Sequence, residues 1–283
     1  MLKIAYCAGH DLSTPGKRVP AALDAARPRE WVLNDRIADG FALAAESYPD
    51  IALLRTDDPL GLTTVPIAKR TQKANAWGAD LYIDMHHNAG INLGKGGGLT
   101  VFSYPGSEKG KACRDAVYAA LIDAGAPRGN RSQPLREKKF LSLSKAKMPA
   151  ILVEYAFMDS LSDWQAICAE DFGQRMGAAT LAAVAKLYAL EKADGRTLFL
   201  RQLEALCGGK LPTISAKKNR THRLVEVVQK RLYQLGYTQV GKADGIAGKK
   251  FTQAVMAFQK DHGCVIDGEL TAGCKTWKEL MAA

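Results

Sequence analysis

Two adjacent histidines stand at the end of a short apolar run, at the point where a buried strand should stop. The run Leu81–Met85 has strand length and is bounded by glycines, which are turn residues. Asp84 interrupts the run, and His86 and His87 follow it. Because side chains alternate between the two faces of a strand, only one of the histidines can point the same way as Asp84. Ligands bind beyond the carboxyl ends of strands in open α/β sheets, so chemistry is expected first at this strand end.

Two more strand-like segments end in or contain residues of metal-binding type. Leu2–Ala8 leads into His10, and Glu154 breaks the apolar run Ala150–Phe157. Glu30 opens the helical segment after the first strand. If the strands are parallel, their carboxyl ends meet at one edge of the sheet. Two histidines, a ligating carboxylate and a spare carboxylate suit a catalytic zinc ion, which takes three protein ligands and a water whose proton the spare glutamate accepts.

Simpler roles for these residues stay open at this stage. A histidine at a strand end is most often a hydrogen-bonded polar residue. A glutamate at a helix start, such as Glu30, is favoured by the helix macrodipole. Glu154 could form a buried ion pair with an arginine or lysine, because an ionised carboxylate in an apolar run is costly unless it is paired or metal-bound.

The segments that must position these residues alternate between strand and helix. In chain order they are strand Leu2–Ala8, helix Glu30–Ser47, strand Ile51–Leu54, helix Pro66–Trp77 and strand Asp80–His86. Further strands are predicted at Leu99–Tyr104 and Ala150–Phe157, and further helices at Lys109–Ala124 and Asp171–Leu190. This alternation predicts parallel pairing and an α/β sheet.

Composition and charge indicate which binding partners and which cellular compartment to expect. The 283 residues include 39 lysines and arginines against 29 aspartates and glutamates, a formal net charge of +10, which favours a polyanionic partner. No nucleic-acid-binding module is recognisable, so no nucleic acid is expected. The six cysteines form no CxxC pair and are expected to be free thiols. The N-terminus lacks the features of a signal peptide and no stretch reaches membrane-spanning length, so we expect cytoplasmic synthesis and no stable membrane insertion.

Four stretches within residues 1–190 resemble the zinc-dependent N-acetylmuramoyl-L-alanine amidases of the Amidase_3 family. They are AGHD (Ala8–Asp11), the helix-opening Glu30, YIDMHHNAG (Tyr82–Gly90) and MPAILVEYAFMDS (Met148–Ser160). In that family a Gly-His turn, a glutamate further along the chain and the histidine of a Ser-Ile-His-Ala-Asn-Ala strand bind zinc. A glutamate in a Pro-Ala-Val-Leu-Val-Glu strand is the catalytic acid/base.

The resemblance implies that His10, Glu30 and His86 bind Zn²⁺ and that Glu154 is the catalytic residue. It also implies the family's fold, a twisted, mostly parallel six-stranded sheet flanked by helices. The chain departs from the family at Asp84, where the family prefers serine, and at His87, where it prefers alanine.

The tail resembles a small helical peptidoglycan-binding module, PG_binding_1. The matching stretches are VQKRLYQLGY, ADGIAGKKFTQAVMAFQKDHG and DGELTAGCKTW. We therefore predict a catalytic domain over residues 1–190, a linker over 191–221 and a small all-α domain over 222–283.

Together these features predict a peptidoglycan hydrolase of the endolysin kind, which cleaves the amide between N-acetylmuramic acid and L-alanine. Its expected partners are peptidoglycan and anionic wall polymers, and it would act at the bacterial wall after release. The alternatives are an exported antibacterial toxin amidase and a non-catalytic wall-binding protein.

Overall fold

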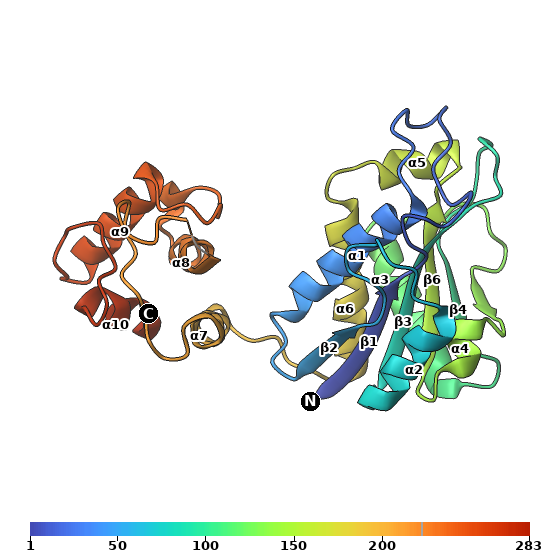
Figure 1. The fold of residues 1–283 in the computed structure, drawn as a ribbon, viewed down its shortest axis with the longest axis horizontal. Helices are drawn as coiled ribbons and strands as arrows, with labels where there is room; N and C mark the ends of the chain where they lie inside the picture. Colours follow the sequence, from blue (N-terminus) through green and yellow to red (C-terminus); the bar gives the residue numbers. More distant parts are fainter. Residues whose placement is uncertain (222) are drawn as a thin grey trace. The chain divides into compact units, whose positions relative to one another are not determined.

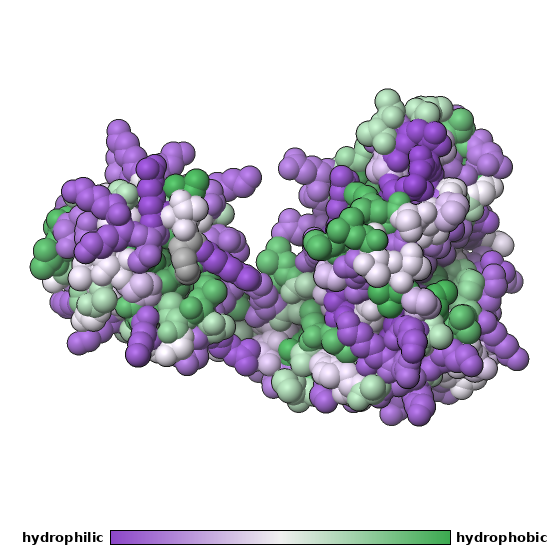
Figure 2. All heavy atoms as spheres, viewed as in Figure 1, coloured by the Kyte–Doolittle hydropathy of each residue, from purple (hydrophilic) through white to green (hydrophobic). Residues whose placement is uncertain are grey.

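The chain folds into two compact units, Met1–Lys192 and Ala193–Ala283 (Figure 1). The structure is a computed structural model that describes residues 1–221 and 223–283. Within those ranges, no helix combines the length and apolar character needed to cross a bilayer. Hydrophilic side chains cover most of the face shown in Figure 2, and hydrophobic side chains form smaller patches between them.

The first unit is built on a six-stranded sheet in the order β2-β1-β3-β6-β4-β5. The strands are β1 (Leu2–Ala8), β2 (Ile51–Arg55), β3 (Leu81–Asn88), β4 (Thr100–Ser103), β5 (Leu135–Glu137) and β6 (Ala150–Phe157). All pairs are parallel except β4 with β6, which are antiparallel. The predicted six-stranded, mostly parallel sheet is therefore confirmed. No helix separates β3 from β4, and without a crossover helix β4 is free to reverse direction.

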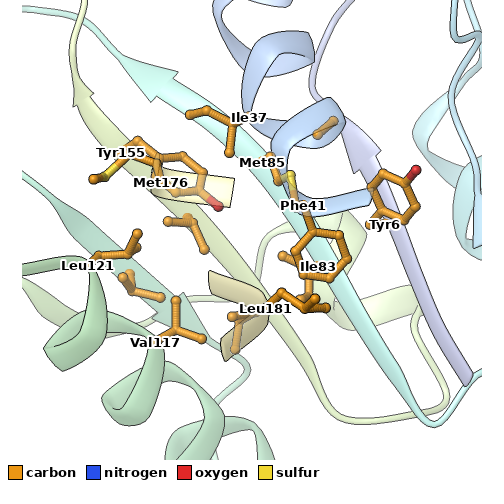
Figure 3. Close-up of a cluster of buried hydrophobic side chains, with 14 of the residues drawn as sticks. Tyr6, Ile37, Phe41, Ile83, Met85, Val117, Leu121, Tyr155, Met176 and Leu181 are labelled. Carbon is orange, nitrogen blue, oxygen red and sulfur yellow. The ribbon is translucent and has the colours of Figure 1, made fainter. Parts of the chain in front are cut away.

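Helices cover both faces of this sheet. They are α1 (Glu30–Ala45), α2 (Ile67–Trp77), α3 (Glu108–Asp123), α4 (Leu141–Lys145), α5 (Leu161–Ile167) and α6 (Phe172–Leu187). The main core lies between the sheet and helices α1, α3 and α6, and its buried residues include Phe41, Met176, Ile83 and Met85 (Figure 3). A smaller cluster on the other face joins Tyr82 to residues of α2 and α4. Burial on both faces explains the continuous apolar runs of β3 and β6.

Helices α1 and α6 approach each other closely because glycines line their contact. A β-carbon added to Gly177 of α6 would lie 2.3 Å from the Phe41 backbone nitrogen. The close contact holds α1, whose first residue is Glu30, firmly against the core.

The second unit is helical and has its own core. It contains α7 (Gly195–Cys207), α8 (Arg223–Gln234), a 3₁₀ turn (Thr238–Val240), α9 (Lys249–Asp261) and α10 (Lys275–Ala282). Phe258 and Trp277 are buried in this core. Phe199 and Leu203 of α7 are buried in it as well, so part of the predicted linker 191–221 packs with the module. The domain boundaries at 190 and 222 stay predictions.

One hydrogen-bonding arrangement occurs twice in this unit. The side chain of Gln229 accepts a hydrogen bond from Gly245 N and donates to Asp244 Oδ1 and Ile246 O. Gln259 does the same in the loop of Asp267, Gly268 and Glu269. Each glutamine thus ties one Asp-Gly turn to a helix, which indicates an internally repeated helix-and-turn unit.

Candidate metal and catalytic site

Three side chains that lie far apart in the sequence meet at the edge of the first sheet. Ligand-type atoms of His10, Glu30 and His86 all lie within 4.8 Å of one another. Glu30 Oε1 is 3.3 Å from His10 Nε2 and 3.1 Å from His86 Nδ1. The two imidazole rings meet edge-on, with centroids 5.0 Å apart. The carboxylate therefore lies between two imidazoles, as in a site for one divalent cation.

The topology explains why these residues converge. β1 and β3 are parallel neighbours, so His10 and His86 lie at the same end of the sheet. The irregular loop after β1 returns to this end, where Glu30 N donates to Lys17 O at 3.1 Å. Glu30 is the first residue of α1 and is completely buried.

Two buried side chains, Arg70 and Asn34, hold the backbone that presents His10. Arg70 Nη1 donates to Ala8 O and Nη2 donates to His10 O, each at 2.7 Å. Asn34 Nδ2 donates to Gly9 O at 3.1 Å. His10 itself has φ of 67°, a left-handed conformation that non-glycine residues rarely adopt. Because three successive carbonyls are bonded by fixed side chains, the strained conformation is maintained.

Gly9 and the His86 ring are in direct contact. A β-carbon added to Gly9 would lie 2.1 Å from His86 Cε1, so only glycine leaves room for the ring. The Gly-His pair at the end of β1 therefore serves both sides of the cluster: His10 supplies a ligand-type nitrogen, and Gly9 leaves room for the second imidazole.

The adjacent His87 lies on the opposite face of β3. Its ring is 2% exposed and packs near Tyr155 and Phe172. Its Nδ1 lies 2.8 Å from Asn34 Oδ1 and donates to it, since the Asn34 amide nitrogen already donates to Gly9. Burial lowers the pKa of His87 to about 4, so this ring is neutral at pH 7. His87 is thus a core residue outside the cluster.

Glu154 lies beside His86 on the neighbouring strand. The two residues are Cα partners in the parallel pair β3–β6, so their side chains project from the same face. Glu154 Oε2 is buried and has no hydrogen-bond partner among the described residues. Burial raises the pKa of Glu154 to about 7, although the charge of His86 opposes the shift. No arginine or lysine in the described part of the chain forms an ion pair with it, so the simpler ion-pair role is not found.

The electrostatics of the cluster suit a cation. Burial alone would raise the pKa of Glu30, but hydrogen bonds from His10 and His86 hold it well below its ordinary value. Burial would lower the pKa of His86, but Asp84 and Glu30 raise it well above its ordinary value. Glu30 Oε2 is buried without a hydrogen-bond donor in the described ranges, and its nearest cation, Lys17 Nζ, is 3.4 Å away. The residues present therefore fit a metal ion, which would satisfy this oxygen.

Sequence reasoning missed two residues of this site. Asn34 follows Glu30 by one helical turn, and a polar residue on the buried face of α1 was an available signal. Arg70 gave no sequence signal, because an arginine in a helix rich in polar residues normally lies on the surface.

Two imidazoles and a carboxylate that fit a divalent cation, beside a spare buried carboxylate at the edge of an α/β sheet, suit the site of a metal-dependent hydrolase. Family comparison then identifies which one. The chain belongs to the N-acetylmuramoyl-L-alanine amidase family Amidase_3, whose model matches residues 4–186. Residues 221–279 match a peptidoglycan-binding domain, PG_binding_1.

Individual relatives agree with this assignment. The chain is 28% identical over 208 residues to the N-acetylmuramoyl-L-alanine amidase CwlM of Bacillus licheniformis, covering 72% of this chain and 76% of that one. It is 28% identical over 210 residues to the sporulation-specific amidase of Bacillus subtilis, covering 72% and 75%.

Solved structures share the fold. The catalytic domain of CwlV from Paenibacillus polymyxa superposes with a TM-score of 0.59 at 16% identity, covering 68% of this chain and all of that one. An amidase from Clostridium difficile 630 gives a TM-score of 0.59 at 21% identity, covering 66% and 97%. The chain is a peptidoglycan hydrolase with N-acetylmuramoyl-L-alanine amidase activity, as predicted from the sequence.

Proposed function

We propose that His10, Glu30 and His86 hold one zinc ion and that Glu154 is the proton-transfer residue of the amidase reaction. The observation that carries the proposal is the convergence of the three side chains within 4.8 Å, with Glu154 as the strand neighbour of His86. The family is zinc-dependent, and three protein ligands leave a position for water.

The reaction needs a Lewis acid and a group that moves one proton. A bound zinc ion supplies the first, by polarising the amide carbonyl and a water molecule. Glu154 supplies the second: a carboxyl with a pKa of about 7 can accept the water's proton and then deliver it to the leaving L-alanine amine. Glu30 cannot share this task, because a carboxylate that binds the metal stays ionised.

The two adjacent histidines give a matched test of the metal site. Purified protein should contain about one zinc per chain, and a chelator should abolish activity until zinc is restored. His86→Ala should remove zinc and activity together, whereas His87→Ala, a substitution in the core, should keep zinc while lowering stability. Metal analysis of both variants decides between them, and zinc loss in His87→Ala alone would contradict the assignment.

Glu154→Gln separates proton transfer from metal binding. Glutamine keeps the shape of the side chain but cannot accept a proton, so the rate of peptidoglycan cleavage should fall by about 10²–10⁴-fold. Zinc content should stay near that of the wild type, since the three ligands are elsewhere. Activity and zinc should be measured in the same sample. A nearly fully active variant would exclude Glu154 as the base, and a zinc-free variant would make it a ligand.

We further propose that residues 222–283 form a wall-binding module joined to the catalytic domain by residues 191–221. The match of residues 221–279 to a peptidoglycan-binding domain supports a module that begins near residue 222, and the second core adds Phe199 and Leu203 of the proposed linker to it. The net positive charge would add salt-sensitive attraction to anionic wall polymers.

Two fragments, one beginning at residue 193 and one at 222, test the module. Both should be retained on purified sacculi without cleaving them. The longer should unfold at the higher temperature, because it keeps Phe199 and Leu203 buried and each such side chain contributes about 1.5–3 kcal/mol. A soluble, folded fragment that passes through unretained would show that the second unit does not bind the wall by itself.

The lytic role predicted from the sequence remains our proposal. A catalytic domain that cuts the wall, joined to a domain that binds it, suits an endolysin. The named relatives are Bacillus amidases, so sequence similarity does not indicate a phage origin. The neighbouring genes discriminate: a holin gene supports the endolysin, and an immunity gene would instead support an exported toxin.

A further inference from the structure

Asp84 is a buried carboxylate inside the apolar strand β3, and the proposed reaction gives it no task. It is 4% exposed and precedes His86 by two residues, so both side chains project from the same face of the strand. It is also the position at which the chain departs from the serine of the family it resembles. A buried charge needs specific partners, and these partners indicate its role.

Two side chains contact the same oxygen of Asp84, and the hydroxyl of Ser142 also hydrogen-bonds to the carboxylate. Asp84 Oδ1 lies 3.1 Å from His86 Nε2. The thiol of Cys7, its strand neighbour on β1, donates to the same oxygen at 3.0 Å. Cys7 Sγ in turn lies 3.1 Å from the hydroxyl of Tyr82. The carboxylate is thus fixed by side chains of two strands and aimed at the imidazole.

The two nitrogens of His86 face different carboxylates. Nδ1 faces Glu30 in the cluster at 3.1 Å, and Nε2 faces Asp84 at 3.1 Å. An imidazole that donates from one nitrogen has a lone pair on the other, and a metal needs that lone pair. In the metal-free protein Nδ1 shares a proton with Glu30, and a bound cation would replace that proton. The hydrogen bond from Nε2 to Asp84 therefore leaves Nδ1 as the ligand atom.

The ring is also restrained from the side. Gly9 lies directly against it, at a distance that leaves no room for a β-carbon. Gly9 thus limits the tilt of the ring, and the hydrogen bond to Asp84 limits its rotation about the Cβ–Cγ bond. Together they fix the direction of the Nδ1 lone pair.

We propose that Asp84 is a positioning residue that orients His86 and selects its Nδ1 as the metal-binding nitrogen. This inference rests on the proposed zinc site. Outer partners of this kind typically change metal affinity by about 10–100-fold, because they fix both the tautomer and the orientation of the ligand.

The test is the zinc dissociation constant of the full-length protein, measured at one pH by competition with a chromophoric chelator. Asp84→Ala should weaken zinc binding by about 10–100-fold. Asp84→Asn, which keeps an oxygen that accepts from Nε2, should recover most of the loss. The control is Asp163→Ala, which removes another buried carboxylate of the same unit. The buried Asp163 carboxylate accepts hydrogen bonds from Gly98 N and Phe157 N, away from the cluster, so zinc affinity should be unchanged.

A spectroscopic readout covers the case in which Asp84→Ala does not fold. In ¹⁵N-histidine spectra of the zinc-loaded wild type, His86 should show a metal-bound Nδ1 and a protonated Nε2, and the Nε2 proton signal should shift in Asp84→Asn.

Two outcomes would overturn the inference. One is a folded Asp84→Ala protein that binds zinc within twofold of the wild type, and the other is a wild-type spectrum with the metal on Nε2. A wild type that binds no zinc would instead refute the proposed metal site, so the two failures are distinguishable.

Discussion

The site depends on a completely buried carboxylate, Glu30, held between two imidazoles. An ionised carboxylate without water is stable only if it is paired and hydrogen-bonded. Here the pairing comes from His10 and His86, whose strands are neighbours in the sheet. A small error in any of the three backbone segments would leave the charge uncompensated. The rest of the first unit holds β1, β3 and the start of α1 in the relative positions that this pairing needs.

Contacts on both faces of the sheet maintain these relative positions. On the main core side, α1 packs closely on α6 through glycines, and Asn34 of α1 bonds to both Gly9 and His87. On the other side, Arg70 of α2 bonds to the carbonyls around His10. Each strand end therefore has a buried polar anchor, and hydrogen-bond networks of this kind favour one arrangement of the backbone. Glu154 differs from Glu30 because, in the described ranges, no imidazole hydrogen bond offsets its burial, and burial raises its pKa to about 7, near neutral pH.

Most of the parallel sheet and the convergence of His10, Glu30 and His86 could be predicted, because alternating strands and helices force strand ends to one edge. The choice of His86 over His87 followed from resemblance, and the structure adds the physical reason, since the alternation of β3 sends His87 into the core. Three features gave little sequence signal. The short strand β5 lies in a basic stretch with almost no apolar pattern. The role of Arg70 depends on contacts across the fold. The packing of α7 in the second core depends on two buried side chains, Phe199 and Leu203.

The central claim is that one zinc ion is held by two imidazoles and one carboxylate, with Glu154 outside its coordination shell. X-ray absorption at the zinc edge of the loaded, full-length protein tests this most directly. We predict two imidazole nitrogens at about 2.0–2.1 Å, oxygen ligands at about 2.0–2.2 Å and no sulfur, with the same spectrum in Glu154→Gln. A sulfur shell near about 2.3 Å, a third imidazole, or a spectrum altered by Glu154→Gln would contradict the account.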